Sequence, residues 1–76
     1  MKKETLNKIA DILYDVPLMS KAIMTSILSA PDTEEEAQKM LDFLLENIDN
    51  PEVMDTDFLI PNKHKMTGQI PWDQDN

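Results

Sequence analysis

A run of apolar residues with helical spacing lies in the middle of the chain and constrains its fold more than any other feature. Between residues 33 and 49 the apolar positions follow one another at intervals of 3, 1, 3, 1 and 3, and they are Ala37, Met40, Leu41, Leu44, Leu45 and Ile48. This spacing places them on one face of a helix, with polar residues opposite. Thr33, with Glu36 three residues later, has the capping-box pattern of a helix start, and Asp32 is the alternative cap. Because Asn50-Pro51 ends the pattern, we predict a helix over residues 33–49.

The N-terminal part of the chain has a similar periodicity, which a proline interrupts. One face at about 100° per residue carries Leu6, Ile9, Leu13, Val16, Met24 and Ile27. Pro17 cannot donate a helical hydrogen bond to the carbonyl of Leu13, and Asp15 is a suitable N-cap for a second helix. We therefore predict two helices, over residues 3–14 and 16–29, with a single helix kinked at Pro17 as the alternative.

The C-terminal third is predicted to be less regular. Asn50 is expected to cap a short turn near residues 51–54, and the apolar run Phe58-Leu59-Ile60 is expected to fold back on the helices. From Pro61 onward we find no periodicity, so residues 61–76 are predicted to form an extended, irregular tail. Trp72 in this tail is a candidate anchor, either for a partner or for the protein's own helices. The predicted fold is therefore all-α: a single domain over residues 1–60, a small bundle of three helices, followed by the tail.

The composition excludes several classes of function. The chain has no cysteine and no arginine, and its 7 lysines face 15 acidic residues, for a net charge of −8. Direct binding of nucleic acid requires a basic face, so it is not expected. With one Gly and one His, the chain lacks the residues for a Gly-rich phosphate loop and has little acid–base chemistry, so we predict neither catalytic residues nor a cofactor. His64, between two lysines, is interpreted as a solvated tail residue.

The negative charge is concentrated in one segment. Residues 32–57 hold ten acidic residues and one lysine, a net charge of −9, whereas the segments on either side are close to neutral. Such a density costs stability through self-repulsion. The acidic residues between Asn50 and Asp57 resemble calcium ligands, but Pro51 and Met54 interrupt them and no Gly is present, so no metal site is predicted. A solvated helix face is one interpretation of this segment, and a binding surface for a basic partner is the other.

We adopt the second interpretation as the leading hypothesis. The protein is predicted to be a non-enzymatic inhibitor that occupies a basic, nucleic-acid-binding surface of a partner protein such as a nuclease, as immunity proteins, anti-CRISPR proteins and antitoxins do. The partner-binding residues are predicted to be Glu35, Glu36, Asp42, Glu46, Asp49, Glu52, Asp55 and Asp57. The alternative is a homo-oligomeric helical bundle, such as a homodimer with a structural or adaptor role, because Leu18, Met19 and Ala22 extend the apolar surface of residues 16–29. Without a targeting signal or an apolar run of membrane length, we expect a cytoplasmic protein with no membrane contact.

Part of the acidic segment also resembles a known family. Residues 32–61, which include Asp-Thr-Glu-Glu-Glu-Ala-Gln-Lys, Phe-Leu-Leu-Glu-Asn and Thr-Asp-Phe-Leu-Ile-Pro, are similar to the second and third helices of the colicin/pyocin-type nuclease immunity proteins. The resemblance implies a small acidic helical protein that inhibits a DNase toxin. By matching position it implies that the toxin contacts are Glu35, Glu36, Asp42, Glu46 and Asp57. The family's Tyr pair is replaced here by Phe58-Leu59-Ile60, and its last helix has no counterpart.

Overall fold

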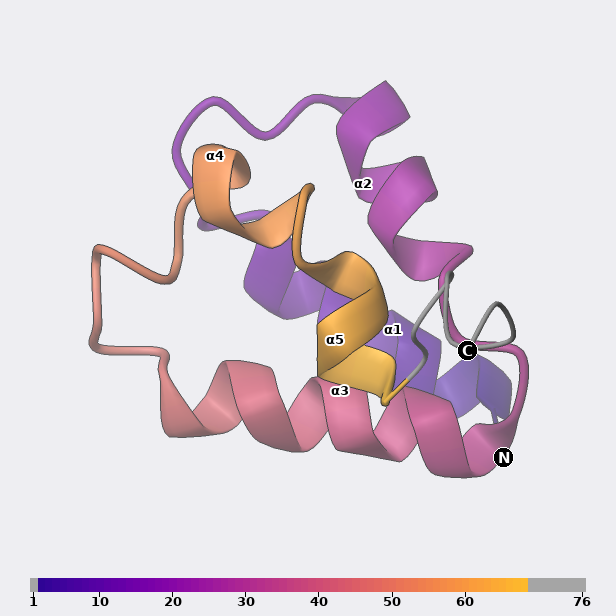
Figure 1. Ribbon diagram of the computed structural model, residues 1–76. Coiled ribbons are helices and arrows are strands. Elements are labelled where there is room, and N and C mark those ends of the chain that lie inside the picture. The colour runs from indigo at the N-terminus through magenta and orange to yellow at the C-terminus, as the bar shows by residue number, and fades with distance from the viewer. Residues whose placement is uncertain (1, 69–76) are drawn as a thin grey trace, which may run out of the picture.

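The described part of the chain, residues 2–68 of the computed structural model, is entirely helical, without a strand. Figure 1 shows how the helices are arranged. They are α1 (Lys2–Leu13), α2 (Lys21–Leu28), α3 (Glu34–Glu46), α4 (Thr56–Leu59) and α5 (Lys63–Thr67). The predicted all-α class is confirmed, whereas the arrangement differs from a bundle of three helices.

The two longest helices, α1 and α3, begin at the same end of the molecule and run side by side (Figure 1). Two hydrogen bonds join their first turns. The hydroxyl of Thr5 donates to Oε2 of Glu34 at 2.7 Å, and Nζ of Lys2 donates to the carbonyl of Asp32 at 3.3 Å. These bonds hold the start of α3 against α1, so the position of the acidic helix is set by the N-terminal helix.

The predicted helix over residues 16–29 is wrong in its first turn. The chain forms a β-turn from Val16 to Met19, closed by a hydrogen bond of 3.3 Å from the Met19 N–H to the Val16 carbonyl. Pro17 takes the second position of this turn, which its fixed φ favours, and Leu18 takes the third with φ +64°. A left-handed residue cannot continue a helix, which also excludes the kinked helix. α2 instead begins after Ser20, whose hydroxyl accepts the Ile23 N–H at 3.2 Å.

The central helix is confirmed at its start and is shorter than predicted at its end. Thr33 is the N-cap, and its hydroxyl accepts the Glu36 N–H at 3.1 Å. At the other end Asn47 is the C-cap, where its side-chain amide donates to the Phe43 carbonyl at 2.9 Å. An Asn side chain that bonds the backbone in this way competes with the helical pattern. The last residues of the predicted helix therefore form a turn, residues 47–49.

The predicted extended tail is also corrected, because part of it folds onto the domain. α5 packs against α3, and Met66 and Thr67 on α5 are buried. Lys63 Nζ donates to the Ser26 hydroxyl at 2.6 Å, which ties α5 to α2. A single turn of helix has too few residues to show apolar periodicity in the sequence, which is why tertiary packing rather than local pattern determines it. Trp72 lies outside the described residues.

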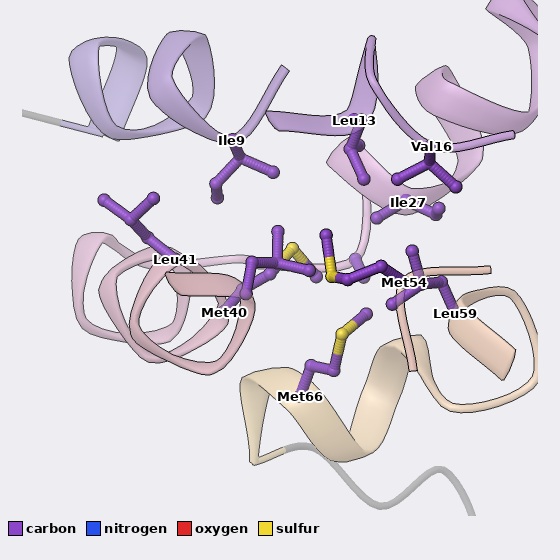
Figure 2. Packing of buried hydrophobic residues seen from close by; sticks show 11 residues of the cluster. Ile9, Leu13, Val16, Ile27, Met40, Leu41, Met54, Leu59 and Met66 are labelled. Atoms are coloured by element: carbon purple, nitrogen blue, oxygen red, sulfur yellow. The ribbon is translucent and has the colours of Figure 1, made fainter. Parts of the chain in front are cut away.

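The core takes residues from all five helices and from the segments that connect them. Figure 2 shows Met40 and Met54 in its middle, with Met66 reaching toward them from α5. The buried apolar cluster consists of Ile9, Leu13, Val16, Ile27, Ala30, Met40, Leu41, Leu44, Met54, Leu59 and Met66. Methionine fills irregular gaps between helices that meet at different angles. The predicted packing of residues 58–60 is confirmed, with Leu59 buried and its two neighbours packed against the cluster.

Candidate functional site

The acidic residues at the start of α3 have roles in holding the fold together. The Glu36 carboxylate accepts the Asp32 N–H at 2.7 Å, one residue before the Thr33 cap, and Glu34 accepts the Thr5 hydroxyl. Negative charge in a first helical turn is also favoured by the helix dipole. Folding therefore accounts for the acidity of this end of α3. Of the two predicted binding residues here, Glu36 is half-buried and Glu35 is exposed.

The outer side of α3 carries the acidic residues that point away from the core. At 100° per residue Glu35, Asp42 and Glu46 fall within about 40° of one another, opposite the buried Ala37 and Leu44. All three are exposed, and Asp49 is exposed in the turn that follows. Glu35 and Glu46 are about 16 Å apart along the axis at 1.5 Å per residue. We name these four residues, Glu35, Asp42, Glu46 and Asp49, the acidic surface.

Lys39, the one cation of the acidic segment, extends toward α5. A Cβ placed on Gly68 would lie 3.4 Å from Nζ of Lys39, so the ammonium group lies beside the C-terminal cap of α5. The carbonyls at a helix C-terminus attract positive charge. Lys39 therefore leaves the outer side of α3 with its ammonium group at the cap of α5.

The segment after α3 separates the remaining predicted residues from the acidic surface. Asn50 caps the predicted turn, since its side chain accepts the Glu52 N–H at 3.1 Å and its carbonyl accepts the Met54 N–H at 2.9 Å. Glu52 is exposed in this turn. Figure 1 shows α4 set apart from α3 by this segment. Glu52 therefore follows the acidic surface closely in the sequence, whereas Asp55 and Asp57 belong to the start of α4, which is set apart from α3.

Asp55 and Asp57 mark the start of α4. Asp55 is the N-cap, and its carboxylate accepts the Asp57 N–H at 2.9 Å. Asp55 is half-buried, whereas Asp57 is exposed in the first turn. The pattern Asp-Thr-Asp before an apolar run is a helix-start signal. We predicted these two acids only as partner-binding residues. Helix capping accounts for Asp55 as it does for Glu36.

Two apolar residues next to the acidic surface are exposed. Leu45 and Ile48 belong to the apolar face of the predicted helix, but their exposed fractions are 52% and 51%. Buried residues occupy the same face nearer the helix start, namely Ala37, Met40, Leu41 and Leu44. The apolar stripe of α3 is thus wider than the surface that the other helices cover. Sequence periodicity cannot reveal this, because it does not indicate where the neighbouring helices end.

Histidine 64 differs from the predicted solvated tail residue. It lies on α5 and is half-buried, and its Nδ1 atom is buried without a hydrogen-bond partner. Residues 2–68 contain no group of three or more His, Asp or Glu side chains placed to hold a metal ion. Over the same residues, no helix has the length and apolarity needed to cross a membrane.

Comparison of the chain with protein-family models, with curated proteins and with solved structures found no match.

Proposed function

We propose that this chain is a non-enzymatic protein-binding module that uses the acidic surface to occupy a basic surface of a partner protein and inhibit it. The surface consists of Glu35, Asp42, Glu46 and Asp49, and Glu52 extends it along the chain. In this proposal the protein needs no metal or cofactor, and it acts through electrostatic complementarity. Such complementarity accelerates association and selects the partner.

The observation that supports this proposal is the position of the acidic residues at the end of α3. Glu46 is the last residue of the helix, and no basic residue lies in its last turn. Negative charge at a helix C-terminus is unfavourable, since the carbonyl ends already carry partial negative charge. Asp42 and Glu46 are also a like-charge pair four residues apart, which opposes folding further. Folding therefore explains the acids at the start of α3, and the Gln38 side chain donates to Oδ1 of Asp42 at 2.9 Å, but the helix gains nothing from the charge of Glu46.

A partner that normally binds nucleic acid fits this surface best. The exposed carboxylates follow one line along α3 over about 16 Å, and a basic groove made for phosphates would meet them as it meets a nucleic-acid backbone. Immunity proteins, anti-CRISPR proteins and antitoxins act in this way, and the resemblance of residues 32–61 to nuclease immunity proteins implies the same mechanism. A nuclease is the partner that this resemblance favours.

The test compares two variants that change the charge by the same amount in different places. One replaces Asp42, Glu46 and Asp49 with Lys, and the other replaces the exposed acids of the N-terminal segment, Glu4, Asp11 and Asp15, with Lys. Each protein is immobilised and exposed to lysate of its own organism at low and high salt, and the retained proteins are identified. Circular dichroism establishes that both variants fold.

We expect the wild type and the N-terminal variant to retain the same basic protein at low salt and to release it at high salt. The α3 variant should not retain it. The purified partner is then assayed for binding to nucleic acid by fluorescence anisotropy, where added wild-type protein should compete. Equal retention by both variants, or a partner whose nucleic-acid binding is unaffected, would contradict the proposal.

A second candidate function is self-association through the loop before α2. Leu18 is 88% exposed and Tyr14 is 75% exposed, so two large apolar side chains face solvent in one short segment. Exposed apolar side chains of this kind occur at subunit interfaces. Light scattering over a dilution series tests this function, and a monomer at micromolar concentration excludes an obligate homodimer.

A further inference from the structure

The acidic surface borders an apolar pair that the fold leaves half uncovered. Leu45 and Ile48 are 52% and 51% exposed, and neither belongs to the apolar side chains packed against the core. They are three residues apart, a spacing that makes side chains neighbours where the chain is helical. Although α3 ends at Glu46, the turn over residues 47–49 follows it directly. The pair therefore forms one apolar patch at the end of α3.

Acidic residues flank this patch along the chain. Asp42 lies three residues before Leu45 on the same helix, and Asp49 lies four residues after it in the turn. Both are exposed, and residues 43–48 between them include no Lys. Leu45 therefore has an exposed acidic residue about one helical turn before it and another shortly after it in the chain. This arrangement favours a partner with positive charges on either side of an apolar side chain.

We propose that Leu45 and Ile48 are the apolar centre of the acidic surface, and that the partner presents a cationic amphipathic segment to it. The inference rests on the proposed function and specifies the partner's chemistry. Lys or Arg side chains of the segment pair with Asp42 and Asp49, while its apolar side chains cover Leu45 and Ile48. Apolar anchors at the centre of a polar rim supply most of the affinity in many protein interfaces, and the charges supply orientation.

The expected contribution follows from the area that remains exposed. Full burial of a Leu or Ile side chain gives about 1.5–3 kcal/mol, and each of these residues has about half of its surface left to bury. Part of this gain is lost in ordering the interface. We expect the pair to strengthen binding about tenfold, which corresponds to about 1.4 kcal/mol.

The test uses two synthetic helical peptides of equal length and equal positive charge. One carries Leu along one face between its lysines, and the other carries Ser at each of those positions. Dissociation constants are measured by isothermal titration calorimetry at low and high salt, with the full chain. We expect the wild type to bind the Leu peptide about tenfold more tightly than the Ser peptide. Salt should weaken binding of both peptides.

Variants then locate the preference on the surface. Leu45→Ser with Ile48→Ser should abolish the preference and leave the affinity for the Ser peptide unchanged. The matched control is Tyr14→Ser with Leu18→Ser, which removes exposed apolar side chains outside the acidic segment and should preserve the preference. If the double variant at α3 fails to fold, Ile48→Ser alone, outside the helix, should reduce the preference severalfold.

The outcomes separate the inference from the proposed function. Equal binding of the two peptides by the wild type overturns the inference and leaves the acidic surface as a purely electrostatic site. A preference that only the Tyr14 and Leu18 control removes also overturns it, because the apolar contact then lies elsewhere. If neither peptide binds at low salt, the proposed function itself is wrong.

Discussion

Neutralising Glu46, the last residue of α3, is expected to stabilise the protein. Glu46 is exposed and has no basic neighbour in its turn, so its charge meets the negative end of the helix dipole, an effect of about 0.3–1 kcal/mol at low ionic strength. Repulsion by Asp42 four residues earlier adds about 0.2–0.5 kcal/mol. Gln has nearly the same size and helix propensity as Glu. The variant Glu46→Gln should therefore gain about 0.5–1.5 kcal/mol in the free energy of unfolding.

The matched control lies at the opposite end of the same helix. Glu35 is also exposed, but it lies in the first turn of α3, where the dipole favours negative charge. Glu35→Gln should therefore destabilise the protein by about 0.3–1 kcal/mol. The two substitutions remove the same charge from the same helix, so their opposite signs isolate the effect of position. If only the smaller magnitude of the net charge mattered, both substitutions would change the stability in the same direction.

The assay is urea denaturation followed by circular dichroism, at low salt and at about 1 M salt, where the Debye length falls to about 3 Å. For a domain of this size 1 kcal/mol corresponds to about 4–8 °C in melting temperature, so thermal melts give an independent reading. At high salt both differences should shrink toward zero. Shifts of the same sign, or shifts that salt does not change, would refute the electrostatic account of the acidic surface.

Four further substitutions test the packing and the turns. Leu18→Gly should stabilise the protein by about 0.5–1 kcal/mol relative to Leu18→Ala in urea denaturation. The conformation with φ +64° costs a residue with a Cβ about 1–2 kcal/mol, whereas Gly loses about 0.5–1 kcal/mol more backbone entropy on folding. Equal stability of the two variants would contradict this prediction. Gly68→Ala should destabilise the protein by about 1 kcal/mol, because Gly68 has φ +87° and an added Cβ contacts the Lys39 side chain. An unchanged melting temperature would contradict this prediction. Thr33→Ala removes the N-cap of α3 and should cost about 1 kcal/mol in the same assay, whereas Thr33→Ser should cost little. Met66→Ala leaves a cavity beside a side chain that is only 4% exposed and should cost about 2–5 kcal/mol; a loss below about 1 kcal/mol would show that α5 contributes little to the core.

Local signals predicted the central helix well, since periodicity and capping both come from neighbouring residues. Thr33 is the N-cap as predicted, and Asn50 caps the following turn. The end of the helix depended instead on the Asn47 side chain, which bonds the Phe43 carbonyl. The sequence does not decide between this bond and another helical turn. Capping also accounts for Asp55, whose carboxylate was predicted to bind a partner.

The turn before α2 and the helix after residue 62 depended on packing that local patterns do not encode. Pro17 is compatible with a first helical position and with the second position of a β-turn, and the chain takes the turn even though Leu18 must adopt a left-handed conformation. α5 has five residues, and it is held by burial of Met66 and by the bond from Lys63 to Ser26. Both features depend on residues of other helices, which the local sequence of α5 does not specify.

The two unfavourable features of the fold lie at the same end of α3, and one binding event would relieve both. The charge of Glu46 meets the negative end of the helix dipole, while Leu45 beside it stays half exposed to water. In the proposed complex a cationic segment pairs with Asp42 and Asp49, which lie on either side of Leu45 in the chain, so its charge contacts and its apolar contact form together. Contacts that share one partner segment are coupled and do not add independently. The loss of peptide affinity on removing Leu45 should therefore be smaller once Asp42 and Asp49 are neutral, which an independent apolar patch and an independent acidic patch would not show.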